Sequence, residues 1–209
     1  MLTKPNLTDL NTLKEELFTF IWDFKHGANI VYNFEVLHSL YEARNVATDK
    51  NKLNKPITIS IVSIIEAVLI DFLVRIDEAT NHLPTNVSQE TLDEIKTEIE
   101  KKKKPEKIGD EFGKRIFLKR KMYPFNEIIK IMKKHELFGV KEDKIYKQLE
   151  NFGNIRNRVH IQNYHQNFED YEHKVFTSHR LTVLEKLLAN LWDKMTDDYK
   201  RPWQPATEL

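Results

Sequence analysis

Two residues late in the chain, Arg156 and His160, have the types and spacing of a phosphate-handling pair. Residues four apart on a helix share one face, so a fixed cation would stand beside a titratable imidazole. Arginine binds non-bridging phosphate oxygens through paired hydrogen bonds and stabilises developing charge, and histidine transfers protons near neutral pH. RNA carries its own nucleophile, the 2′-hydroxyl, so the pair suits RNA phosphodiester chemistry.

The helical wheel places Arg156 where an apolar residue is expected. With Ile145 at zero and about 100° per residue, Arg156 falls near +20°, inside an apolar stripe, and His160 falls near +60°, at its edge. Arg158 falls near 220°, on the opposite face. Because an arginine in a protein stays charged, Arg156 must be paired with another group or face a wet crevice.

Glu66 is the candidate partner for this arginine. It is embedded in the most apolar stretch of the chain, Ile57 to Val74, where an unpaired carboxylate is costly. We therefore expect Glu66 to pair with Arg156 and to orient its guanidinium or neutralise it at rest. Glu66 and Asp71 interrupt the apolar stretch, which favours a core helix over a membrane span.

The segment from Lys101 to Lys121 is strongly basic. It holds ten basic and three acidic residues, a local charge of +7 in a chain whose net charge is +1. With Pro105 and two glycines inside it, we interpret it as an exposed connector or insertion, and a solvated loop is the simpler account. The functional alternative is a track for the RNA backbone, with Phe117 and Tyr123 as stacking groups. Its candidate RNA-binding residues are Lys114, Arg115, Lys119, Arg120 and Lys121.

Composition limits the class of protein. The chain has 209 residues, 40% of them apolar and 31% charged, which fits one domain with a sizeable core. It has no cysteine, which excludes disulfides, thiolate catalysis and Cys-based zinc sites and favours a reducing compartment. The N-terminus has no cationic start followed by an apolar run, so we expect no signal peptide and a cytoplasmic protein.

The hydrophobic pattern predicts an all-α, up-and-down bundle of about six to seven helices. One domain is expected over residues 1–200, with the basic insertion at 101–121 and a proline-containing tail at 201–209 that cannot extend the last helix. Gly27 is the expected break between the first two helices, and Thr91 with Glu94 is a capping-box pattern. The predicted helices start near Thr8, Ile30, Pro56, Thr91, Pro124 and Glu142, and the last one starts at a cap formed by Thr177 or Ser178.

Other polar and aromatic residues have simpler interpretations. We expect Asp71 and Ser63 to be ordinary helix-surface or capping residues. The histidines outside the Arg156–His160 region show no metal-ligand spacing, so no metal site is expected. The aromatic residues predicted to lie in the core are Trp22, Phe24, Phe72 and Trp192.

The run IRNRVHI, from Ile155 to Ile161, lies late in an all-α chain and follows an apolar helix with one embedded glutamate. In this it resembles the HEPN superfamily. The resemblance implies a helical bundle that usually dimerises and, in many members, a metal-independent RNase of toxin–antitoxin, phage-defence or RNA-processing systems. It further implies that the motif arginine is Arg156, that the polar residue after it is Asn157, and that the motif histidine is His160.

The spacing of the motif leaves two registers open. The family usually places four to six residues between its Arg and His. Arg156 and His160 have three between them, whereas Arg158 and His165 have six. The helical wheel favours Arg156, with His165 as a supporting candidate from beyond the helix. The resemblance implies RNA as substrate, a homodimer in which two motifs form one site, an antitoxin or other protein partner, and no cofactor or membrane.

Three functions remain open at this stage. The leading one is a HEPN-type endoribonuclease that forms a cyclic phosphate, or an RNA-binding relative of it. His160 would act as general base or general acid, Arg156 would hold the scissile phosphate, and Asn157 would orient one of them or the RNA. The alternatives are a non-enzymatic helical module for protein interaction or dimerisation and a nucleotide-binding accessory domain. The same residues could also form a structural polar cluster that fixes helix packing.

Overall fold

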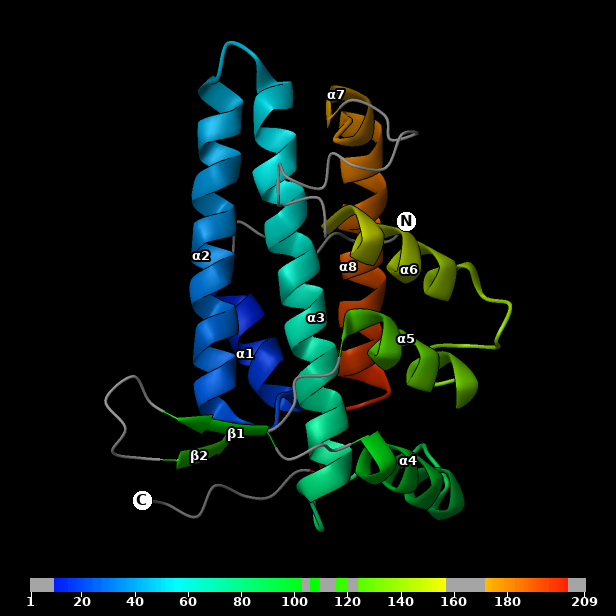
Figure 1. The fold of residues 1–209 in the computed structure, drawn as a ribbon. Coiled ribbons are helices and arrows are strands. Elements are labelled where there is room, and N and C mark those ends of the chain that lie inside the picture. The colour runs from blue at the N-terminus through cyan, green and yellow to red at the C-terminus, as the bar shows by residue number, and fades with distance from the viewer. Residues whose placement is uncertain (1–9, 103–105, 110–115, 120–123, 157–171, 203–209) are drawn as a thin grey trace.

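The computed structural model is a helical bundle with one short hairpin, which confirms the predicted all-α class (Figure 1). It describes residues 10–102, 106–109, 116–119, 124–156 and 172–202, with the backbone alone in the two strands. The helices are α1 (Leu10–Phe20), α2 (Phe24–Val46), a 3-10 turn (Lys50–Leu53), α3 (Asn54–Glu78), α4 (Gln89–Lys102), α5 (Phe125–Lys134), α6 (Lys144–Arg156), α7 (Glu172–Val175) and α8 (Ser178–Asp197).

Helix α3 lies at the centre of the bundle. It packs against α2, α4, α5, α6 and α8, while α1 packs against α2 and α8 (Figure 1). Apolar residues spaced along α3 from Ile57 to Ile76 are almost fully buried, so the run that is most apolar in sequence forms the core. Within the described residues, Lys50–Glu78 is long and apolar enough to cross a membrane. A central core helix meets the same criterion, so that length is weak evidence for a membrane span.

The break between α1 and α2 is set by Asp71, a residue far away in sequence. Its carboxylate on α3 accepts hydrogen bonds from the backbone N–H groups of Trp22 at 2.6 Å and Asp23 at 3.1 Å. Asp23 in turn caps α2 by accepting a hydrogen bond from the N–H of His26. Asp71 is thus a buried residue that holds the turn between α1 and α2, and the expectation that it lies on the helix surface or caps a helix was wrong.

Gly27 does not interrupt a helix, contrary to the sequence prediction. It lies inside α2, where a Cβ atom would come within 2.9 Å of the Phe18 ring. The lack of a side chain at Gly27 therefore lets α1 and α2 approach closely. The chain turns four to five residues earlier, at Trp22 and Asp23, whose N–H groups donate hydrogen bonds to Asp71.

Several other helix ends follow local signals in the sequence. Thr177 caps α8 by accepting from the N–H of Arg180, as expected. Ser88, rather than Thr91, caps α4, since its hydroxyl accepts from the N–H of Thr91. Helix α5 begins after Pro124 and ends at Lys134, and Glu136, two residues later, adopts a positive φ of 54°.

The basic segment contains a feature that the sequence prediction lacked. Strands β1 (Glu106–Gly109) and β2 (Ile116–Lys119) form an antiparallel pair in which Lys107 lies opposite Leu118. The β2 sequence IFLK is rich in β-branched and aromatic types that favour strands. The described part of the segment between α4 and α5 is therefore a β-hairpin, where a loop was the simpler expectation.

Two of the four aromatic residues predicted to lie in the core are buried there. Phe72 and Trp192 are almost fully buried, and Trp192 meets the Phe20 ring edge to face at 5.1 Å. Trp22 is only half-buried. Phe24 is 63% exposed and stacks on Phe18, so its assignment to the core was wrong. Phe24 is the first residue of α2, next to the turn that joins α1 to α2.

Candidate functional site

Arg156 is the last residue of α6, and its guanidinium reaches the side chain of Glu66 on α3. The Arg156 Nη2 atom lies 2.7 Å from Glu66 Oε2. The Glu66 side chain is 12% exposed and the Arg156 side chain 37% exposed, so the pair is buried on its glutamate side and open on its arginine side. The predicted pairing of these two residues is confirmed.

The packing of α6 explains why Arg156 reaches this position. Ile145, Leu149 and Phe152 are buried and hold one face of α6 against the bundle. At Gly153 a Cβ atom would lie 2.6 Å from the Phe125 ring, so only glycine lets the end of α6 approach the start of α5 so closely. Arg156 continues the apolar stripe by one turn and therefore points at α3, as the helical wheel predicted.

The electrostatics of the pair are asymmetric. Burial raises the pKa of Glu66 above its ordinary value, and the positive charge of Arg156 opposes that rise. Arg156 is thus the neighbour that favours the ionised form of Glu66. Within the described residues, no other acidic or carbonyl group contacts the guanidinium of Arg156. An arginine has five N–H donors, so donors remain for a further acceptor such as a phosphate oxygen.

Most of the other predicted site residues lie outside the described residues. These are Asn157, His160 and His165 of the motif region and Lys114, Arg115, Arg120 and Lys121 of the basic segment. Lys119 is in β2, where the backbone alone is described. The structure therefore brings Arg156 together with Glu66, and the remaining assignments stay predictions.

A second arginine site on α3 was missed by sequence reasoning. Arg75 has no exposed surface, and it donates hydrogen bonds to the carbonyl of Phe20 at 2.9 Å and that of Tyr199 at 2.8 Å. Its guanidinium lies over the Phe72 ring at 5.1 Å. Arg75 joins the end of α1 to the residues after α8, which is a structural role. The only sequence signal for it is one charge near the end of an apolar helix.

A hollow of about 390 Å³ lies between the start of α6 and the end of α8. Its charged lining residues are four aspartates and two lysines, and burial followed by the charges of Asp197 and Glu16 raises the pKa of Asp193. The excess of negative charge in this lining disfavours a phosphate, so the hollow is a weaker candidate for RNA than Arg156. The charged residues that line it are Asp143, Lys144, Asp193, Lys194, Asp197 and Asp198.

Known proteins give no further guide to the site. Among the residues that the structure describes, no group of three or more His, Cys, Asp or Glu side chains is arranged to hold a metal ion. Comparisons of the chain with protein-family models, with curated proteins and with solved structures find no match. The geometry of Arg156 and Glu66 must therefore carry the functional argument together with the sequence motif.

Proposed function

We propose that the chain is a metal-independent endoribonuclease of HEPN type, or an RNA-binding relative, of the kind found in toxin–antitoxin and phage-defence systems. Arg156 binds an RNA phosphate, and His160 supplies the acid–base group. One observation carries the proposal: Arg156 lies on an apolar helix face, its guanidinium contacts the mostly buried carboxylate of Glu66, and its own side chain stays 37% exposed. Arg75, the structural arginine, by contrast has no exposed surface.

Glu66 acts as a positioning residue in this proposal. It lies beneath Arg156, contacts one nitrogen of the guanidinium, and restricts the rotamers of a long side chain. Fixing the cation before RNA binds lowers the entropy lost on binding. Two N–H groups of one arginine can bind two oxygens of the same phosphate. The exposed edge of Arg156 therefore suits a phosphodiester better than the ammonium group of a lysine would.

The reaction follows from the chemistry of RNA. A base, assigned to His160, takes the proton of the 2′-hydroxyl, and the 2′-oxygen attacks phosphorus. The bond from phosphorus to the 5′-oxygen breaks, and that oxygen takes a proton from an acid, which the second motif of a dimer would provide. The products are a 2′,3′-cyclic phosphate and a 5′-hydroxyl. Arg156 stabilises the negative charge that grows on the non-bridging oxygens.

Cleavage of mixed RNA in the presence of EDTA tests this proposal. We expect the wild type to cleave, and we expect Arg156→Ala and His160→Ala each to reduce the rate by at least about 100-fold. Lys147→Ala is the matched control, since Lys147 is an exposed cation on the same helix. If wild type and variants alike fail to cleave and bind RNA equally well, the proposal is wrong. Failure to cleave with weaker binding by Arg156→Ala supports the RNA-binding relative.

An interaction or dimerisation module is the second candidate. Phe24, Tyr32 and Val36 recur every four or eight residues along α2 and are exposed by 63%, 64% and 36%. Such exposed apolar side chains on one helix suit contact with another protein. Replacing Tyr32 with glutamate should then abolish self-association in sedimentation experiments, whether or not RNA is bound. If the chain is monomeric with and without this change, dimerisation through α2 is excluded.

A further inference from the structure

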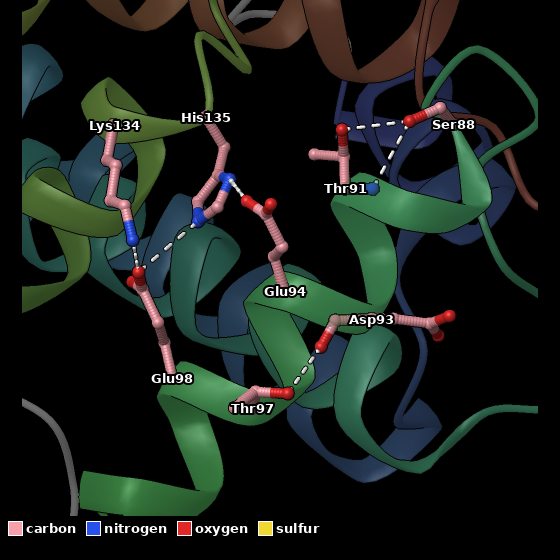
Figure 2. Close-up of polar contacts among 8 residues, drawn as sticks. All are labelled: Ser88, Thr91, Asp93, Glu94, Thr97, Glu98, Lys134 and His135. Carbon is pink, nitrogen blue, oxygen red and sulfur yellow. Dashed lines mark hydrogen bonds and ion pairs between the residues drawn. The ribbon is translucent and has the colours of Figure 1, made fainter.

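His135, which follows α5, has a buried imidazole between two carboxylates of α4. Its side chain is 4% exposed. Nδ1 lies 3.6 Å from Glu94 Oε2 and Nε2 lies 3.6 Å from Glu98 Oε1 (Figure 2). Both distances exceed those of good hydrogen bonds. The Nε2 atom is buried without a hydrogen-bond partner among the described residues, so the ring occupies this position with one polar atom unsatisfied.

The ring lies where the peripheral helix α4 meets the bundle. Leu92, Ile95 and Ile99 are buried and form the apolar face of α4, which packs on α3. The rest of α4 is highly polar. At the end of α5, Lys134 and the following residue, His135, meet the carboxylates of α4 (Figure 2). A change of charge at this contact therefore affects the docking of a helix that buries few apolar side chains.

The two carboxylates do not make the site favourable for an imidazolium. Glu98 forms an ion pair with Lys134, and Glu94 is 60% exposed, where water screens its charge. Lys141 adds a further positive charge nearby. Burial first and then Lys134 lower the pKa of His135 below its ordinary value, and Glu94 only partly opposes them. The docked helix therefore holds the neutral ring.

We propose that His135 is a proton-sensitive latch for α4, in which protonation of the ring weakens the docking of α4 on α3 and α5. Acidification would then release α4 together with the start of the basic segment that follows it. The groups that face the ring are Glu94 and Glu98 from α4, Lys134 from α5 and Lys141 from the loop after it. The inference does not depend on the RNase proposal, since none of these residues belongs to that site.

The direction of the pH effect follows from proton linkage. Because the pKa of His135 is lower when α4 is docked than when it is released, the released state binds more protons. Docking is therefore strongest above the ordinary histidine pKa of about 6.5 and weakens as the pH falls below it. Each unit of difference between the two pKa values multiplies the population of released α4 about tenfold once both states are protonated.

Hydrogen exchange of the whole protein at pH 7.5 and pH 5.5, corrected for intrinsic exchange rates, tests the latch. In the wild type, the opening constant of amides in α4 should rise at least about threefold on acidification relative to amides in α8. His135→Gln should remove that rise. His38→Gln is the matched control, since His38 lies beside a glutamate, Glu42, on α2, and it should respond like the wild type.

Two results would overturn the latch. One is a wild-type α4 whose opening constant does not change with pH, and the other is an equal rise in His135→Gln. If the glutamine variant undocks α4 already at pH 7.5, an NMR titration of His135 in the wild type decides. A midpoint below that of histidine in the urea-unfolded chain supports the proposal, and a midpoint equal to it or above it contradicts the proposal.

Discussion

Helix α3 has two arginine sites that differ in their access to water. Arg75, near its end, has no exposed surface and donates to backbone carbonyls from two separate parts of the chain. Arg156, which comes to α3 from α6, is 37% exposed and contacts one oxygen of Glu66. The first site is sealed by the protein, and the second has an open side.

The comparison shows what separates a structural arginine from an available one. Both sites place a guanidinium against an otherwise apolar helix, so residue type and pattern do not distinguish them. Burial lowers the pKa of Arg75 to about 10, which reflects how fully that side chain is desolvated. An arginine so deep can hold helices together but cannot meet a ligand, whereas Arg156 can do both.

The largest expected effect is on the sealed site. Arg75→Ala should reduce the free energy of unfolding by about 3–5 kcal/mol, because it leaves the Phe20 and Tyr199 carbonyls without their donor and removes one of the positive charges that act on buried Asp71. Urea denaturation measures the change. Arg180→Ala, at an exposed arginine on α8, should cost less than about 1 kcal/mol. Similar costs for the two variants would remove the distinction between buried and exposed arginines.

A smaller and asymmetric effect is expected at the open site. Arg156→Ala should cost about 1–2 kcal/mol, since it leaves the mostly buried Glu66 carboxylate unpaired. Glu66→Gln should change stability by less than about 0.5 kcal/mol, because the guanidinium left behind is partly hydrated. Thermal unfolding at neutral pH measures both.

The pH dependence sharpens that asymmetry. The pKa of Glu66 is higher in the folded than in the unfolded protein, so ionised Glu66 opposes folding at neutral pH. That opposition is relieved as the pH falls through the raised pKa, and the stability of wild type should then rise relative to Glu66→Gln. If Glu66→Gln loses more stability than Arg156→Ala at neutral pH, this account of the pair is wrong.

The sequence allowed much of this comparison to be predicted where local signals were strong. The apolar run with Pro56 at its start located α3, and Pro124 and Thr177 marked the starts of α5 and α8. The helical wheel put Arg156 on the apolar face, and the cost of an unpaired carboxylate pointed to Glu66. Helical periodicity and the cost of burying a charge can both be read from a single sequence.

The features that escaped prediction depend on distant parts of the chain. Asp71 holds a turn 48 and 49 residues away, so Gly27 was mistaken for the break. Arg75 finds its acceptors 55 and 124 residues away. His135 meets α4 only because α3 brings α4 and α5 together. Neither periodicity nor composition contains such pairings.

Binding of an uncleavable single-stranded RNA, with 2′-O-methyl groups, tests most directly whether the open arginine receives phosphate. We expect Arg156→Ala to weaken binding about three- to tenfold and to lower the slope of log affinity against log salt by about 0.7, the loss of one phosphate contact. Lys147→Ala should match the wild type, and Arg156→Lys should fall between. If Arg156→Ala binds with wild-type affinity and an unchanged salt slope, Arg156 does not hold RNA, and the central claim is wrong.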